Sequence, residues 1–305
     1  MDAAGYEEFS FFHENAGEYG LPFPGPPRVR RLAVEVEPGR SLSGLLWGEG
    51  PPEMVLLHGG AQNAHTWDTV ALALDRPLLA VDLPGHGHSD GGRAGSLGLG
   101  DNAADVARVI GELAPAAGLL VGMSLGGLTS IILAAGNRDL VGRLALIDVT
   151  PGVTGAKASA ITQFIAGPES FESFEELLER TVAFNPTRSV SSLRRGILHN
   201  AVQREDGSWV WRYARFRAAE TVGPGGPPPI DFGNLWDLLG GLTIPVMLVR
   251  GMLPQSVVDD ADEAELRRRL PSARIEHVEG AGHSVQGDKP LELAALLADF
   301  ARTGV

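Results

Sequence analysis

Short apolar runs that stop at glycine or polar residues most constrain the fold of this chain. Met54–Leu57, Leu78–Val81 and Leu144–Ile147 are such runs, each of strand length. Runs of this kind are typical of strands buried on both faces of a parallel sheet. Apolar residues at helical spacing separate them, as in Asn102–Leu113 and Leu125–Ala135. The alternation predicts an α/β fold whose mostly parallel sheet is covered by helices on both faces.

Five further segments read as strands and bring the predicted sheet to eight. Arg28–Glu37 alternates apolar and polar residues, and a hairpin turn connects it to Ser41–Trp47. Leu119–Val121, Val246–Val249 and Arg274–Val278 are the others.

The alternation breaks between Pro151 and Gly241, where helical patterns follow one another at Ala156–Ala166, Phe174–Phe184 and Val190–Val202. A helical insertion in an α/β chain indicates a cap over one end of the sheet. We therefore predict an N-terminal arm at 1–27, a core formed by 28–150 and 242–305, and a helical cap at 151–241.

Composition excludes several kinds of chemistry. The 305 residues include no cysteine, which removes disulfides, thiolate metal sites and a cysteine nucleophile. A net charge of −13 argues against a nucleic-acid partner. No apolar stretch is long enough for a membrane span, and the acidic N-terminus does not resemble a signal peptide. We expect a cytoplasmic protein.

Ser124 is the candidate nucleophile. It occupies the pattern G-x-S-x-G between Gly122 and Gly126, after a predicted strand and before a predicted helix. A sharp strand-to-helix turn lifts the serine hydroxyl clear of the sheet, and glycines at the flanks avoid collisions of a Cβ with neighbouring backbone. Ser89 lies in a second match, but a Pro-Gly turn precedes it and Gly91 follows, so it reads as a turn residue.

With these residues the chain resembles the α/β-hydrolase superfamily over nearly its whole length. His58-Gly59-Gly60 resembles the oxyanion loop of that superfamily, and Asp82 to Ser89 resembles its D-x-P-G-x-G-x-S turn. Gly122 to Gly126 resembles its nucleophile elbow, and Gly280 to His283 its terminal histidine loop. The resemblance implies an α/β-hydrolase fold with a helical cap insertion.

His283 is the candidate base, because a serine hydroxyl needs a general base and His283 lies in a glycine-rich loop between the last strand and the last helix. His86 and His88 form an H-x-H pair, but no third ligand at sensible spacing accompanies them. We therefore expect no metal, and the resemblance implies no cofactor.

Three carboxylates are candidates for the acid that would orient His283. Many members of the superfamily carry it after the strand equivalent to Val246–Val249, where this chain has Gln255, a neutral amide. A minority carry it at the end of the strand after the nucleophile helix, which implies Asp148. Asp259 and Asp260 remain the alternatives.

The resemblance also implies an oxyanion hole formed by the backbone N–H groups of Gly60 and Leu125. We expect the substrate pocket between the strand ends and the cap. Its candidate wall residues are apolar and come from the core and the cap: Trp67, Met123, Phe164, Phe184 and Trp211.

The N-terminal arm is unusually aromatic and must bury its rings on the cap or against a second subunit, which would make a homodimer. Its aromatic residues are Tyr6, Phe9, Phe11, Phe12, Tyr19 and Phe23.

The sequence therefore predicts a cofactor-free serine hydrolase that cleaves a carboxylic ester or related acyl compound, a small molecule, through an acyl-enzyme. A carbon–carbon bond hydrolase, a thioesterase and a lactonase are the alternatives within the fold. The missing carboxylate at Gln255 supports a further alternative, a degenerate member that acts as a ligand-binding module.

Overall fold

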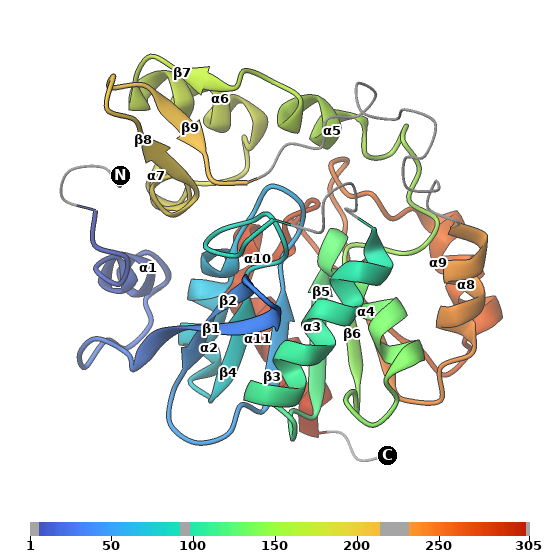
Figure 1. Cartoon of the computed structure of the whole chain (residues 1–305). Coiled ribbons are helices and arrows are strands. Elements are labelled where there is room, and N and C mark those ends of the chain that lie inside the picture. Colours follow the sequence, from blue (N-terminus) through green and yellow to red (C-terminus); the bar gives the residue numbers. More distant parts are fainter. Residues whose placement is uncertain (1–5, 92–97, 214–231, 303–305) are drawn as a thin grey trace.

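An eight-stranded sheet forms the centre of the molecule (Figure 1). The computed structural model describes residues 6–91, 98–213 and 232–302. The strand order is β1-β2-β4-β3-β5-β6-β10-β11. The strands are β1 Val29–Glu37, β2 Arg40–Trp47, β3 Met54–Leu57, β4 Leu78–Val81, β5 Leu119–Met123, β6 Leu144–Ile147, β10 Val246–Gly251 and β11 Arg274–Val278. Only the pairs of β2 with β1 and with β4 are antiparallel, so the prediction of a mostly parallel eight-stranded sheet is confirmed.

Successive side chains of the central strands enter two separate hydrophobic cores. In β3, Val55 and Leu57 face one core, and Met54 and Leu56 face the other. This is the two-residue period of a strand buried on both faces. Each core is closed by helices, so the strand ends are the part of the sheet left open to a substrate.

The helices of the first face are α3 Leu99–Leu113, α4 Leu125–Gly136, α8 Phe232–Gly240 and α9 Asp260–Arg269. Those near the second face are α1 Phe12–Tyr19, the short η1 Ala64–Trp67, α2 Asp68–Leu74, α10 Val285–Asp288 and α11 Pro290–Arg302. Helix α3 begins at Leu99, with Gly98 as its N-cap.

The segment after β6 covers one end of the sheet, at the top of Figure 1. It contains α5 Ser159–Ile165, β7 Ser170–Phe171, α6 Phe174–Phe184, α7 Val190–Asn200, β8 Ala201–Gln203 and β9 Trp209–Trp211. The three strands pair as a small antiparallel sheet, and Leu177, Ile197 and Trp209 contribute to a core of their own. We call residues 151–213 the cap.

Helix α8 lies within the predicted cap range of 151–241, but it belongs to the core. Its residues Leu235 and Leu239 are buried in the first hydrophobic core, where α8 packs against α4. The predicted boundary is therefore too late, because the apolar face of this helix covers the sheet rather than the cap. Residues 214–231 of the predicted cap lie outside the described residues.

The N-terminal arm packs on its own chain. Phe12 is buried against Trp47, with ring centroids 4.9 Å apart, and α1 contacts α2. Tyr6 reaches the cap, where its hydroxyl group is 2.8 Å from His199 Nδ1. The aromatic residues of the arm therefore find partners within the chain on both the core and the cap.

No helix of the described residues is long and apolar enough to cross a membrane.

Candidate active site

Ser124 lies at the sharp turn between β5 and α4. Its backbone φ is 50° and its ψ is −117°, a conformation that L-residues adopt only at a cost in strain. Strain of this kind is held in place only when the surrounding structure fixes it, which the pairing of β5 and the packing of α4 do here. The turn presents Ser124 to a cavity.

The glycines around Ser124 are required by backbone contacts. A Cβ on Gly126 would lie 2.5 Å from the carbonyl oxygen of Leu57, and one on Gly122 would lie 2.5 Å from the carbonyl oxygen of Gly126. No side chain fits at these distances. The tight approach also lets the Gly126 N–H donate a hydrogen bond to the His58 carbonyl, which ties the elbow to the loop after β3.

His283 meets the carboxylate of Asp148. The Nδ1–H of His283 donates to Asp148 Oδ2 at 2.9 Å, and Asp148 is fully buried. The same carboxylate accepts hydrogen bonds from Gly251 N, Ser256 Oγ and Val257 N at 2.9, 2.6 and 3.0 Å. Asp148 also has a positive φ of 46°, directly after β6. Its four donors hold it in one orientation, with one oxygen directed at the imidazole.

The alternative acids serve elsewhere. Asp259 caps α9 and pairs with Lys157 Nζ at 2.8 Å. Asp260 is exposed and pairs with Arg250 at 2.8 Å. Neither contacts His283, so the expectation of Asp259 or Asp260 as its partner is not supported by the geometry.

The hydroxyl of Ser124 and the imidazole of His283 line the same cavity. The hydrogen bonds of the described residues do not include one between these two side chains. Such bonds are often long in ligand-free enzymes and shorten when a substrate is bound.

The backbone N–H groups of Gly60 and Leu125 have no hydrogen-bond acceptor within the described residues. The N–H of Ala61 instead donates to His86 Nε2 at 3.1 Å. The first two groups are therefore free to bind an oxyanion.

Buried neutral histidines hold the loop after β3. His58 Nε2 accepts from Leu83 N at 2.9 Å, and its Nδ1 donates to the Gly59 carbonyl. Burial lowers the pKa of His58 to about 3, since desolvation disfavours the charged imidazolium. His58 is therefore uncharged at neutral pH and supports the loop, as the sequence suggested.

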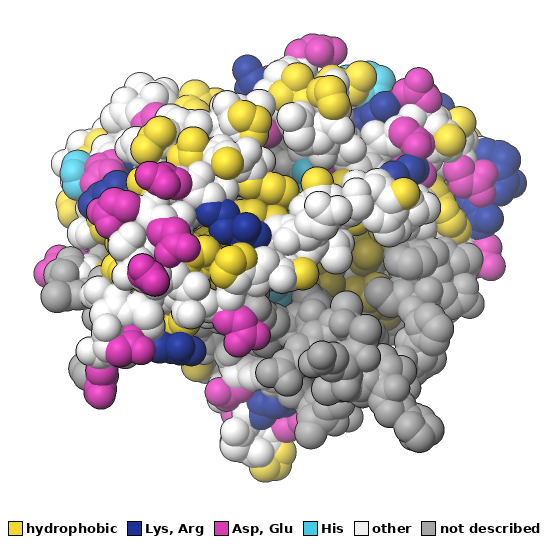
Figure 2. Space-filling view, turned by 90° about the horizontal axis from the view of Figure 1, so that it is seen from above, with side chains coloured by type: hydrophobic (Ala, Val, Ile, Leu, Met, Phe, Trp, Pro, Cys, Tyr) yellow, Lys and Arg dark blue, Asp and Glu magenta, His cyan; other side chains and the backbone are white. Residues whose placement is uncertain are grey.

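The cavity has a volume of about 890 Å³ and lies between the strand ends and the cap. Seen from the cap side of the molecule, hydrophobic side chains line a hollow in the middle of the surface (Figure 2). Four of the predicted wall residues line the cavity: Met123, Phe164, Phe184 and Trp211. The prediction for Trp67 was wrong, because its side chain is fully buried in the second core beneath the sheet.

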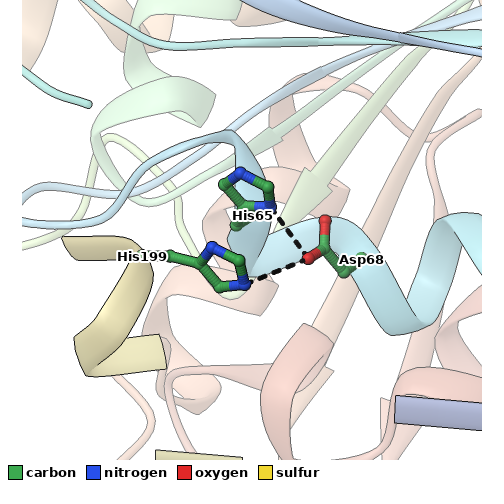
Figure 3. Close-up of side chains that lie close together, drawn as sticks. All are labelled: His65, Asp68 and His199. Carbon is green, nitrogen blue, oxygen red and sulfur yellow. Dashed lines mark hydrogen bonds and ion pairs between the residues drawn. The ribbon is translucent and has the colours of Figure 1, made fainter. Parts of the chain in front are cut away.

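His65, Asp68 and His199 form a cluster whose ligand-type atoms lie within 4.8 Å of one another (Figure 3). The imidazole rings of the two histidines are stacked, with centroids 3.7 Å apart and planes within 9° of parallel. A metal ion binds imidazole in the ring plane, so stacked rings cannot direct nitrogens at one ion without turning. Glu8 and Asp68 already accept from His65, and Tyr6 bonds to His199. The cluster in this arrangement is a hydrogen-bonded network rather than a metal site.

Burial opposes a charge on His65, but the hydrogen bonds and charges of Asp68 and Glu8 outweigh it and raise the pKa of His65 to about 9. Burial opposes a charge on Glu8 as well, but its hydrogen bonds to His65 and Arg31 outweigh this effect and lower the pKa of Glu8 to about 2. His65 is thus an imidazolium between two carboxylates. It connects the arm to the core and stacks on the cap through His199.

Sequence reasoning missed this network and the role of Ser256. His65 and Asp68 are three residues apart, a spacing that is common by chance, and the other members come from distant segments. Ser256 follows Gln255 directly and donates a hydrogen bond to the Asp148 carboxylate. The loop after β10 therefore helps to position the carboxylate of Asp148, although it places none of its own beside His283.

Comparisons with known proteins show the family to which the chain belongs. The model of the alpha/beta hydrolase family matches residues 54–296. The esterase Rv0045c of Mycobacterium tuberculosis is 44% identical over 305 residues, covering 97% of this chain and 96% of its own length. A solved structure of that esterase superposes with a TM-score of 0.85 at 43% identity and covers 98% of this chain and 100% of that one. The sn-1-specific diacylglycerol lipase ABHD11 of Xenopus laevis is 28% identical and covers 82% of this chain and 80% of its own length.

Proposed function

The chain belongs to the alpha/beta hydrolase family, and on this premise we propose that it is a serine ester hydrolase acting on a small carboxylic ester. The observation that carries the proposal is the hydrogen bond between His283 Nδ1 and buried Asp148, beside a cavity that also exposes Ser124. A relative at 44% identity that is named an esterase supports the same activity.

In the proposed mechanism, His283 Nε2 removes the proton of the Ser124 hydroxyl as its oxygen attacks the ester carbonyl. The negative charge of Asp148 stabilises the imidazolium that forms. The N–H groups of Gly60 and Leu125 bind the oxyanion of the tetrahedral intermediate. Its collapse returns the proton from His283 to the leaving alcohol and leaves an acyl-serine.

Water then attacks the acyl-serine, with His283 as the base, and releases the carboxylic acid. The three side chains and two N–H groups suffice for both half-reactions, so the proposal includes neither a metal nor a cofactor. We also propose that the enzyme acts in the cytoplasm and that the cap sets its substrate range, because cap residues Phe164, Phe184 and Trp211 line the cavity.

Labelling with a fluorophosphonate tests the proposal directly, because only an activated serine reacts. We expect one adduct on Ser124, none on the variant Ser124→Ala, and hydrolysis of short p-nitrophenyl esters by the unmodified protein alone. A folded protein that gives no adduct would instead favour the ligand-binding module. The reaction type is resolved by including acyl-thioesters, lactones and vinylogous diketones in the substrate panel.

A further inference from the structure

Arg188 places a positive charge at the wall of the cavity. It directly precedes Ser189, the N-cap of α7. The cavity that Arg188 lines also contains Ser124 and His283. Arg188 therefore lines the same cavity as the reacting groups.

The guanidinium is only partly satisfied. Its Nη2 donates to Ser192 Oγ at 2.6 Å, whereas its Nε is buried without a hydrogen-bond partner. Among the described residues, none forms an ion pair with Arg188. Arg195, which lies within α7 and is buried, pairs with Glu14 and Glu18. A buried charge without a counterion is costly, and burial lowers the pKa of Arg188.

Asp288 and Glu18 are the carboxylates whose charges act on Arg188, and both have other hydrogen-bond partners. Asp288 accepts hydrogen bonds from Thr187 Oγ1 at 3.1 Å and from Gly282 N at 2.8 Å. Glu18 pairs with Arg195 and also accepts from Ser189. The protein thus leaves the Arg188 guanidinium at the cavity wall without a counterion, and the carboxylate of a ligand would supply one.

The position of Gly287 connects Arg188 to the reacting groups. A Cβ on Gly287 would lie 2.9 Å from Cζ and Nη1 of Arg188, so the guanidinium rests against the backbone of α10. His283 directly precedes Ser284, the N-cap of α10, so the histidine and the guanidinium lie at the same short helix and line the same cavity. An anion bound to Arg188 would therefore occupy the cavity in which the ester bond is attacked.

We propose that Arg188 binds a carboxylate of the substrate, so that the esters cleaved are half-esters of dicarboxylic acids. This inference rests on the proposed ester hydrolysis. The carboxylate would be the end of the acyl chain remote from the ester, held by the guanidinium while Ser124 attacks the other end. Because the contact is remote from the reacting atoms, it would act mainly on KM.

The test compares two p-nitrophenyl esters of equal chain length, the hexanoate and the hydrogen adipate, and then longer matched pairs. We expect the wild type to have the higher kcat/KM for the carboxylate-bearing ester of at least one pair. Arg188→Met should reduce that preference ~10- to 100-fold, mainly through KM, and change the rate on the neutral ester little. Arg194→Met removes an exposed charge from α7, the helix that follows Arg188, and should leave the preference unchanged.

Two results would overturn the inference: equal losses on both esters in Arg188→Met, or no wild-type preference for the carboxylate at any chain length. A preference for phosphate-bearing over carboxylate-bearing esters would also contradict it. Thermal unfolding is the second readout. Removing an unpaired, half-buried charge should leave Tm unchanged or higher, whereas a purely structural Arg188 predicts a lower Tm.

Titration calorimetry of adipate on Ser124→Ala separates this inference from the proposed function. Adipate binding that Arg188→Met abolishes in that background supports the anion site even if no ester is hydrolysed. Ester hydrolysis without adipate binding leaves the proposed function intact and contradicts the site.

Discussion

His283 and Asp148 lie 135 positions apart in the sequence, and the fold joins them by a 2.9 Å hydrogen bond. Asp148 directly follows β6, and His283 follows β11 in a loop at the same edge of the sheet. The carboxylate also receives N–H and O–H donors from the loop after β10. That loop therefore orients an acid it does not supply.

Replacing Asp148 by Asn should reduce kcat ~10³- to 10⁴-fold while the protein stays folded. Asparagine tolerates the left-handed backbone at this position, so the variant removes the charge with little added strain. Steady-state kinetics and circular dichroism measure the two effects. Asp260→Asn, an exposed position, is the control and should stay near wild-type activity. Near-normal kcat in Asp148→Asn would remove this residue from the mechanism.

Gly126→Ala should destabilise the protein by ~3 kcal/mol and lower activity. The new Cβ would lie 2.5 Å from the Leu57 carbonyl oxygen, and only a shift of α4 relieves that contact. Urea unfolding gives the free-energy change. Gly136→Ala, at the end of the same helix with nothing within 4 Å of its Cβ, should be neutral or slightly stabilising. Equal effects in the two variants would contradict the steric argument.

The charge on His65 should make stability decrease at alkaline pH. Its pKa is raised from 6.5 to about 9 in the folded protein, so the stabilisation is complete below pH 6.5 and is lost as pH rises through 9. The difference amounts to at most ~3 kcal/mol. Unfolding free energies of wild type and His65→Gln, measured between pH 6 and 10, should converge as pH increases. The exposed His13→Gln should follow the wild-type curve. Parallel curves for wild type and His65→Gln would disprove the network.

Phe12→Ala should cost ~3–5 kcal/mol, because Phe12 is buried against Trp47 and couples the arm to the core. Phe9, which is 36% exposed, gives the matched control, and Phe9→Ala should cost much less. Thermal unfolding of both variants measures the difference in stability.

Size-exclusion chromatography of the same samples tests the expectation of a homodimer. A dissociation produced by Phe12→Ala would show that the arm acts between subunits.

The positions of the strands could be predicted from the sequence because the signal is local. Met54–Leu57 and Leu144–Ile147 are strands in the structure, each ending at the residue where its apolar run ends. The elbow was predictable for the same reason, since the glycines around Ser124 prevent backbone collisions within a few residues. The helices α1, α8 and α9 were missed or left unassigned. Helix α9 in particular has a largely charged sequence and is fixed by its capping box and ion pairs.

Trp67 shows where local reasoning ends. The sequence places it near the strand end that carries Gly60, but the turn of η1 directs the ring into the core instead of the cavity. The same limit applies to Arg188, whose missing counterion cannot be inferred from its neighbours in sequence.

The sequence by itself determined the sheet, the elbow and the choice of Ser124 and His283 as candidate catalytic residues, since hydrophobic periodicity and backbone sterics act over a few residues. Only the tertiary structure decided between Asp148 and the acids near Gln255, because that choice depends on which buried carboxylate receives its donors across three loops. It also decided that the arm packs on its own chain and that Arg188 lines the cavity unpaired. Charge pairing and burial are properties of contacts between distant segments, and they exist only once the chain has folded.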